Sequence, residues 1–495
     1  MGFIKSKKSK KFIATILTLG FVLSLGFGAY QVKHQKKTTQ WTLQKFQTQT
    51  LDWKPCETSF TCASFQVPVD YNHIDGNTFE LKILVHPANI PSQKLGALFV
   101  NPGGPGGSGV DYAFGADSIV SKSIEDAYDI VGFDPRGVNL SQPIRCLTDA
   151  QEDQINADGG TIQTPEDLTM LINDNKLIAT SCAKAAGTRL GHYSTLESAK
   201  DMDILRAILH QPKLNYIGKS YGTFMGTLYA ALFPDKTGRI VLDGAVDPNL
   251  STRDQDIAQA EGFDTALNSF LKSNQSFKLQ DIFDLLKKAH TTPLMVGTRK
   301  LTESLTVTGF AYALYDPQSG GPELKKALNQ AIHQNNGKHL MYLADQYNQR
   351  EKNGHYSSNQ NDISQIVSCL DFPHTQTIKQ MQADEINFAS VAPVFGPYLV
   401  YAGISCNYWQ AKPVLKPTLA DLKTNPMLVI GTTRDPATPY AWAQALHKDL
   451  LDSTLITLNG DGHTGANRGS TCVDNAMNKY LLTGISPESD LYCAK

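Results

Sequence analysis

Residues 218–222, Gly-Lys-Ser-Tyr-Gly, constrain the fold of this chain more than any other stretch. They join a short apolar run, residues 214–217, to an apolar segment at 223–233 that is typical of a buried helix. Glycines on both sides of a serine let the backbone turn sharply from a strand into a helix. The turn exposes the Ser220 hydroxyl at a helix N-terminus, where the helix dipole and free N–H groups favour negative charge.

Short apolar runs like the one before Ser220 recur between segments with helical periodicity. This alternation predicts an α/β fold, with a mostly parallel sheet covered by helices on both faces. The candidate strands are residues 81–85, 97–100, 128–133, 214–217, 239–243, 427–431 and 455–458. The interval between the candidate strands at 239–243 and 427–431 has helical periodicity, and we expect an inserted helical lid there. The predicted organisation is a leader at 1–40, core at 41–248, lid at 249–415 and core again at 416–495.

Composition narrows the possible functions. The chain has 495 residues, of which 41% are hydrophobic and 19% charged, so it can bury a large core. The formal net charge of −2 gives no electrostatic case for nucleic-acid binding. Composition says nothing of the oligomeric state.

The N-terminus has the layout of an export signal. Five lysines between positions 5 and 11 precede an uncharged run at 12–30. Such a run is either a cleaved secretory signal or an uncleaved membrane anchor, and the sequence leaves both open. The lysines place the N-terminus inside and the remainder outside. We therefore expect a secreted protein, or one tethered outside the membrane through residues 12–30.

Eight cysteines fit an exported chain, because disulfides persist in oxidising compartments. None has the Cys-x-x-Cys spacing of a zinc or redox site, and we expect no metal. The alternative of buried free thiols stays open. Pairing neighbours along the chain predicts the disulfides Cys56–Cys62, Cys146–Cys182, Cys369–Cys406 and Cys472–Cys493.

Two further polar residues follow predicted strands. A serine hydroxyl needs a base within hydrogen-bond reach, and that base needs a carboxylate to orient it. Asp435 follows the strand at 427–431, and His463 lies on a glycine-rich loop after the strand at 455–458. Because active sites of open α/β sheets lie at the carboxyl ends of the strands, Ser220, Asp435 and His463 are a candidate catalytic triad. Asp461 competes as the acid, but it does not occupy a strand end of its own.

A glycine-rich segment at 101–109 also follows a strand. Such a loop lets backbone N–H groups approach an oxyanion closely, and we expect the Gly104 and Tyr221 amides to form the oxyanion hole. The loop lacks the Lys-Ser/Thr ending of a nucleotide-binding P-loop.

Taken together, these motifs resemble those of the α/β-hydrolase peptidases related to prolyl aminopeptidase. The resemblance covers most of residues 50–495 and includes residues 103–106, 133–137 and 218–223 and the loops of Asp435 and His463. Prolyl aminopeptidases usually carry histidine at the position of Pro102. The proline found here instead resembles the tripeptidyl-aminopeptidase-like branch. Asp134 and Arg136 match a family motif, and we expect them to form a structural turn.

The resemblance implies the α/β-hydrolase fold and an exopeptidase that needs no cofactor. Such an enzyme needs a carboxylate for the substrate's ammonium group. Candidates in or near the lid are Glu261, Asp264 and Asp371, each of which could instead be solvated or paired in a salt bridge.

Two other functions stay open. An esterase acting on a small ester would use the same machinery as an enzyme acting on peptides, since only the pocket selects the substrate. A non-catalytic binding module of the same fold is less consistent with a complete Ser220, Asp435 and His463 set.

Overall fold

We describe the protein from a computed structural model, in which residues 41–56, 59–372, 374–419 and 422–494 are described. Leu43–Lys495 forms one compact unit. The predicted leader at 1–40, with its apolar run at 12–30, lies outside the described residues. Across the described part of the chain, no helix has both the length and the apolar character needed to cross a bilayer.

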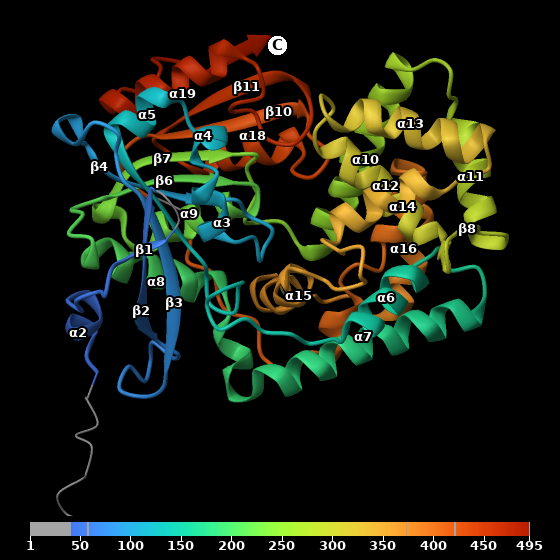
Figure 1. Cartoon of the computed structure of the whole chain (residues 1–495), viewed down its shortest axis with the longest axis horizontal. Helices are drawn as coiled ribbons and strands as arrows, with labels where there is room; N and C mark the ends of the chain where they lie inside the picture. Colours follow the sequence, from blue (N-terminus) through green and yellow to red (C-terminus); the bar gives the residue numbers. More distant parts are fainter. Residues whose placement is uncertain (1–40, 57–58, 373, 420–421, 495) are drawn as a thin grey trace, which may run out of the picture. The chain divides into compact units, whose positions relative to one another are not determined.

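Ten strands of the described residues form one central sheet (Figure 1). They are β1 (Lys54–Cys56), β2 (Phe60–Pro68), β3 (Thr78–His86), β4 (Gly96–Asn101), β5 (Tyr128–Phe133), β6 (Leu214–Lys219), β7 (Thr237–Asp243), β10 (Met427–Arg434), β11 (Ser453–Asp461) and β12 (Leu491–Ala494). Their order across the sheet is β1-β2-β3-β5-β4-β6-β7-β10-β11-β12. The pairs from β1 to β5 are antiparallel and all the others are parallel, so the predicted mostly parallel sheet is confirmed.

Helices cover both faces of the sheet. Side chains alternate along a strand, so neighbouring residues point to opposite faces. Ile217 and Val241 pack in the cluster that contains residues of α3 (Gly109–Phe114), α5 (Lys122–Ala127) and α19 (Thr471–Thr483). Their neighbours Tyr216 and Leu242 instead pack against Gly226 of α9 (Tyr221–Leu232). Because helices cover both faces of the sheet, residues on both sides of each parallel strand are buried. This explains why these strands are continuously apolar in sequence.

Four further helices of the described residues belong to the sheet region. They are α2 (Leu43–Gln47), α4 (Ala116–Ile119), α8 (Thr195–Ile208), which packs on α9, and α18 (Tyr440–Asp449), which packs on β10 and β11.

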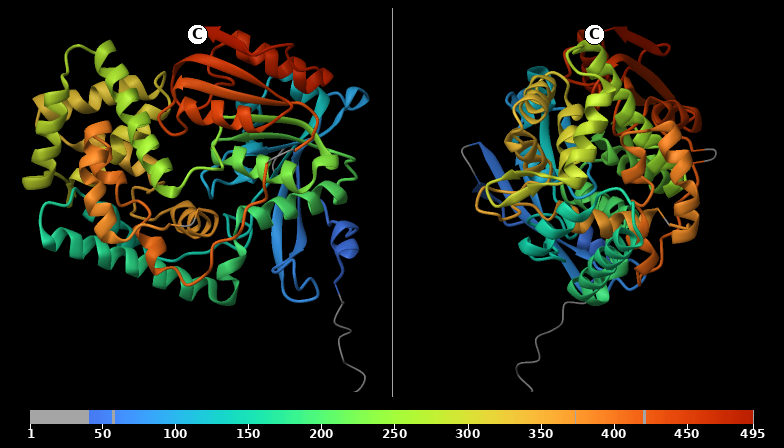
Figure 2. Two further views of the ribbon diagram at one scale, coloured as in Figure 1. Left: turned by 180° about the vertical axis from the view of Figure 1, so that it is seen from behind. Right: turned by 90° about the vertical axis from the view of Figure 1, so that its right-hand side faces the viewer.

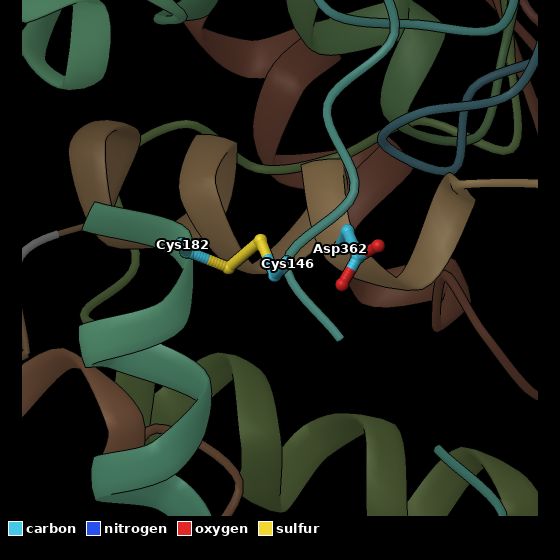
Figure 3. Close-up of side chains that lie close together, drawn as sticks. All are labelled: Cys146, Cys182 and Asp362. Atoms are coloured by element: carbon cyan, nitrogen blue, oxygen red, sulfur yellow. A yellow bond between two sulfur atoms is a disulfide. The ribbon is translucent and has the colours of Figure 1, made fainter. Parts of the chain in front are cut away.

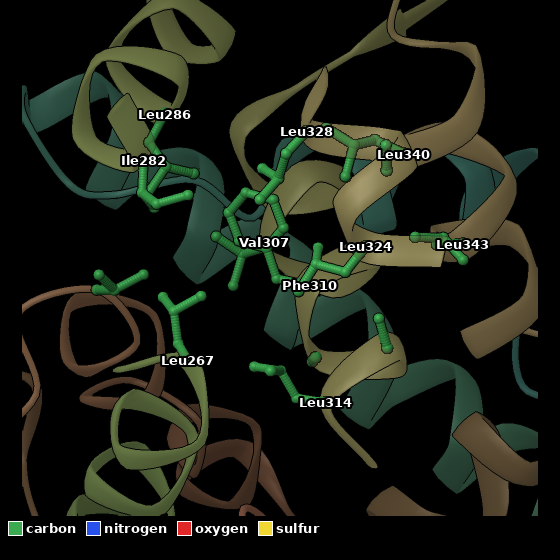
Figure 4. Packing of buried hydrophobic residues seen from close by; sticks show 14 of the residues in the cluster. Leu267, Ile282, Leu286, Val307, Phe310, Leu314, Leu324, Leu328, Leu340 and Leu343 are labelled. Carbon is green, nitrogen blue, oxygen red and sulfur yellow. The ribbon is translucent and has the colours of Figure 1, made fainter. Parts of the chain in front are cut away.

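Between β7 and β10, where the sequence predicts a lid at residues 249–415, the chain is mainly helical. The elements are α10 (Thr252–Ser273), α11 (Leu279–Thr291), the strand pair β8 (Leu294–Val296) and β9 (Arg299–Leu301), α12 (Glu303–Tyr315), α13 (Gly320–His333), α14 (Lys338–Tyr347), α15 (Gln360–Asp371), α16 (Ile378–Val391), α17 (Gly396–Leu399) and the turn η4 (Ile404–Tyr408). Figures 1 and 2 show these helices grouped beside the sheet. They have an apolar core of their own, in which Leu267, Ile282, Val307, Phe310 and Leu328 are buried (Figure 4).

Two helices from the earlier part of the chain join this group. They are α6 (Asp149–Asp158), which packs on α12, and α7 (Pro165–Ala186), which packs on α15 and η4. Ile172 of α7 lies against the cluster of Met381 and Phe388 in α16. The helical layer of this protein therefore consists of residues 149–186 and 252–408, whereas the sequence pattern assigned 149–186 to the core. The helical spacing of apolar residues predicts that a helix forms, but it does not show against which part of the protein that helix packs.

Four disulfides join the cysteines in the neighbouring pairs expected from the sequence. Cys56–Cys62 links β1 to β2, and Cys472–Cys493 links α19 to β12. Cys146–Cys182 and Cys369–Cys406 both fasten parts of the helical layer.

Candidate active site

Ser220 lies at the sharp turn between β6 and α9. Its backbone has φ 55° and ψ −130°, a left-handed conformation that few non-glycine residues adopt. The turn is tight enough that a Cβ at Gly218 would lie 2.3 Å from the Gly222 carbonyl oxygen. The two glycines are therefore required by close packing, and the strain they permit holds Ser220 at the carboxyl end of the sheet.

His463 is hydrogen-bonded to Asp435. Its Nδ1 lies 2.9 Å from Asp435 Oδ1 and 3.1 Å from Oδ2, and both side chains are buried. The Asp435 carboxylate also accepts the amides of Ala437, Thr438 and Thr464, at 2.9 to 3.0 Å. A carboxylate held by several backbone donors cannot rotate freely, so it fixes the orientation of the imidazole.

Asp461, the competing acid, is hydrogen-bonded to Arg434 and to the Ser269 hydroxyl. Its oxygens accept Arg434 Nε at 2.7 Å and Nη2 at 3.0 Å. This ion pair lies where β10 and β11 meet and is about one third exposed. Asp461 therefore shapes the strand end, and Asp435 is the acid beside His463.

Asp243, at the end of β7, connects the serine turn to the histidine loop. Its backbone carbonyl accepts the Ser220 amide at 2.9 Å, and its buried carboxylate accepts the amides of Gly465 and Ala466 at 2.6 and 3.1 Å. Lys219 Nζ lies 3.7 Å from the same carboxylate. Ser220 and His463 thus face the same end of the sheet, although no hydrogen bond joins their side chains in the structure as described. Such bonds are often long in an empty site.

The glycine-rich loop lies directly against the serine turn. A Cβ at Gly103, where φ is 93°, would lie 2.9 Å from the Tyr221 amide nitrogen and 3.0 Å from Ser220 Cβ. Tyr221 provides the first amide of α9, which has no acceptor inside the helix. The glycine-rich loop therefore lies beside Ser220 and the Tyr221 amide, and Gly104 lines the same pocket as both.

Asp134 and Arg136 stabilise the segments next to the glycine-rich loop. Asp134 accepts Ser108 Oγ at 2.6 Å and the Val110 amide at 3.1 Å, which fixes the start of α3. Arg136 is buried and forms two 2.7 Å hydrogen bonds with Asp201. Both have the structural role expected from the sequence.

Ser220 opens into a pocket of about 340 Å³, which we call the Ser220 pocket. Gly104, Pro105 and Tyr221 line it on the side of the sheet, and α10 and α15 line it on the side of the helical layer. A pocket of this volume accommodates a small molecule or a few residues of a peptide.

One acidic side chain of the helical layer borders the Ser220 pocket. Asp256 of α10 lines it and has no hydrogen bond or ion pair to any described residue. Burial raises the pKa of Asp256 well above its usual value. Sequence reasoning missed it and named Glu261, which is exposed on the same helix and does not line the pocket. Five residues rotate a helix by roughly 140°, so both cannot face one pocket.

The other two predicted carboxylates are structural. Asp371 is buried, accepts the Thr195 amide at 3.0 Å, and is linked through the Thr195 hydroxyl to the Tyr221 hydroxyl. Burial raises the pKa of Asp371 to about 7. Asp264 accepts the Phe395 amide at 2.8 Å, next to α17. Neither side chain lines the Ser220 pocket.

The described residues contain two separate groups of side chains that could hold a metal ion, and the members of each group lie close to one another. In the group of Cys146, Cys182 and Asp362, the sulfurs are joined in a disulfide and offer no thiolate (Figure 3). In the group of Asp70, His192 and Glu197, Glu197 lies 3.5 Å from the buried Arg136 guanidinium, whose positive charge disfavours a metal ion. Neither group lines the Ser220 pocket.

Comparison with known proteins places this geometry in a family. Residues 392–493 match a family model described as TAP-like protein. The chain is 32% identical to serine protease Hip1 of Mycobacterium tuberculosis, over 90% of this chain and 91% of that protein. It is 35% identical to carboxylesterase B of the same organism, over 88% and 86% of the two chains. It is 29% identical to the tripeptidyl aminopeptidase of Streptomyces lividans, over 90% and 86%.

Proposed function

Because this chain belongs to the TAP-like branch of the α/β-hydrolases and is a serine hydrolase, we propose that it is an exported exopeptidase. It releases short peptides or single residues from free N-termini through an acyl-enzyme. The observation that carries the peptidase assignment is the unpaired Asp256 carboxylate in the Ser220 pocket.

In the proposed mechanism, Ser220 Oγ attacks the scissile carbonyl and gives its proton to His463 Nε2. Asp435 holds Nδ1 and stabilises the imidazolium that forms. The Gly104 and Tyr221 amides donate to the tetrahedral oxyanion, where preorganised donors lower the barrier. The imidazolium protonates the leaving amine as the C–N bond breaks, and water then hydrolyses the acyl-enzyme by the same route.

Asp256 binds the ammonium group of the substrate. An ionised carboxylate and an ammonium form a charge-assisted hydrogen bond, which is stronger in a shielded pocket than in water. The walls from α10 and α15 limit the length of chain that fits between Asp256 and Ser220. The pocket therefore favours cleavage close to a free N-terminus.

Export is supported by the four disulfides and by the basic, then apolar, layout of residues 1–30. Disulfides of this number are rare in reducing compartments.

A carboxylesterase is the second candidate, because a relative with that name is 35% identical over most of the chain. An ester substrate uses the same Ser220 chemistry but has no ammonium group for Asp256.

A peptide library with free and acetylated N-termini tests the proposal. We expect cleavage only of free N-termini, and no cleavage by Ser220→Ala. Asp256→Asn should lower the ratio of peptide to p-nitrophenyl ester hydrolysis by about 10- to 100-fold, the value of one hydrogen bond to a charged group. Glu261→Gln, on the outer face of the same helix, should leave this ratio unchanged.

Equal cleavage of free and acetylated peptides would remove the exopeptidase assignment while leaving the serine hydrolase intact. Ester hydrolysis without any peptide cleavage would favour the carboxylesterase.

A further inference from the structure

A second pocket, of about 240 Å³, lies along α15 next to the Ser220 pocket. Ser364 and Gln365 of α15 border both pockets. The opposite wall comes from α6, with Glu152 and Asn156. We call it the acidic pocket, because Glu152 and Asp362 are the charged side chains that line it.

Both carboxylates are almost completely buried. Glu152 is 5% and Asp362 is 3% exposed. Within the described part of the chain, Glu152 Oε2 and Asp362 Oδ2 have no hydrogen-bond partner. Asp362 also accepts the backbone amides of Cys146 and Leu147, and Figure 3 shows its carboxylate beside the Cys146–Cys182 disulfide. The loop that contains Cys146 and Leu147 is thus held to α15, while Asp362 Oδ2 is buried without a hydrogen-bond partner among the described residues.

Arg145 lies close enough for its charge to lower the pKa of both Glu152 and Asp362, but neither nearby arginine donates a hydrogen bond to these carboxylates. Arg145 donates to the carbonyl oxygens of Tyr356 and Ser358, at 2.9 and 2.8 Å, and not to either carboxylate. Arg350 is engaged with Asp153, at 2.5 and 2.8 Å.

The remaining charge near the acidic pocket is also mainly negative. His355 lies 3.1 Å from Asp149 and is paired there. Burial first, and then repulsion from Asp362, Asp149 and Asp153, raises the pKa of Glu152 to about 7, although the charge of Arg145 acts against this rise. Two buried acids that repel each other are costly unless a cation separates them.

We propose that the acidic pocket binds a divalent cation with the coordination chemistry of calcium. The lining offers oxygen ligands, from two carboxylates and from the side chains of Asn156, Asn348 and Asn361. Calcium takes six to eight such ligands in flexible geometry, water included. A charge of +2 balances both carboxylates, whereas a single ammonium group would leave one buried charge.

The bound ion connects α6 to α15, and α15 carries a wall of the Ser220 pocket. Its affinity is expected in the range of extracellular calcium sites, about 10⁻⁴ to 10⁻³ M. The ion therefore stabilises the helical layer without taking part in chemistry at Ser220.

Thermal unfolding of the full-length protein at pH 8 tests this inference. Calcium chloride at 10 mM should raise Tm by about 2 to 4 °C relative to EDTA, as expected for an ion that binds only the folded state. Magnesium, which demands stricter geometry, should raise it less. Titration calorimetry should show one calcium site.

Glu152→Gln and Asp362→Asn should each abolish the calcium-dependent shift, and both should fold in EDTA because an amide relieves the charge repulsion. Asp174→Asn is the matched control, since Asp174 is a half-buried carboxylate of α7 outside the acidic pocket, and it should keep the shift. A wild-type protein that does not respond to calcium, or variants that still respond, would overturn the proposal. So would a variant-sensitive shift with methylammonium chloride in place of calcium, which would assign the pocket to an organic ammonium group.

Discussion

Acidic side chains at the carboxyl ends of the strands, which we call the sheet edge, differ from those that border the two pockets of the helical layer. At the sheet edge, both oxygens of Asp435 and of Asp243 accept backbone amides at 2.6 to 3.1 Å. In the helical layer, Asp256 has no partner among the described residues, and Glu152 and Asp362 each have an unpaired oxygen.

This difference separates two tasks. Carboxylates at the sheet edge are fully satisfied within the protein, so they hold the reacting groups in place before any substrate arrives. Asp264 and Asp371 of the helical layer also accept backbone amides, but the carboxylates that border its two pockets each have an oxygen without a partner in the described residues, and such an acid is stabilised by a cation from outside. Under the proposed function, the sheet edge carries the chemistry and the pockets of the helical layer carry recognition.

The largest expected effect comes from Ser220. Ser220→Ala should lower kcat/KM by about 10⁵- to 10⁶-fold, because it removes the nucleophile. Ser368→Ala changes a serine on the helical-layer side of the same pocket and should cost less than about tenfold. Kinetics and phosphonate labelling measure the contrast, and comparable losses in the two variants would contradict the division of tasks.

The next effect compares two acids at the sheet edge. Asp435→Asn should lower kcat by about 10⁴-fold, since an amide supports the wrong tautomer of His463. Asp461→Asn weakens a partly exposed ion pair with Arg434, worth about 1 kcal/mol or less, and the hydrogen bond that Asp461 accepts from the Ser269 hydroxyl, so it should change kcat by less than tenfold. Should the Asp461 variant prove the more damaged of the two, Asp435 is not the orienting acid.

The smallest effect concerns pH and Asp256. Burial raises the pKa of Asp256, so this carboxyl is protonated in acid and cannot bind an ammonium group there. As pH rises through that pKa, KM for peptides with free N-termini should fall by up to roughly tenfold per pH unit, and it should rise again above about pH 8 as the substrate amine deprotonates. The KM of an ester substrate serves as the control and should lack both limbs. A peptide KM that does not change with pH would exclude Asp256 as the ammonium partner.

The sheet and the candidate triad could be predicted from the sequence because their signals are local. Each of Ser220, Asp435 and His463 follows an apolar strand, and glycine marks the turn at two of them. Parallel strands bring their carboxyl ends to one edge, so three local patterns converge in space.

The recognition residues could not be predicted in the same way. Asp256 and Glu261 belong to one helix, and only its rotation against the Ser220 pocket decides which of them lines it. The joining of α6 and α7 to the helical layer depends on long-range packing, which a helical period does not encode. The Glu152–Asp362 pairing brings together residues 210 positions apart.

The backbone amide of His463 donates to the Tyr315 carbonyl of α12 at 2.8 Å, and the Tyr315 ring lies against the imidazole edge to face, with centroids 5.2 Å apart. The helical layer therefore supports His463, the general base of the proposed mechanism, as well as lining the Ser220 pocket. If the whole layer swung open as a rigid flap, the imidazole would lose this support, so a widely open enzyme would also be an impaired one. Under the proposed function, a peptide would have to enter this closed arrangement by a free end, which a folded protein presents only at its termini.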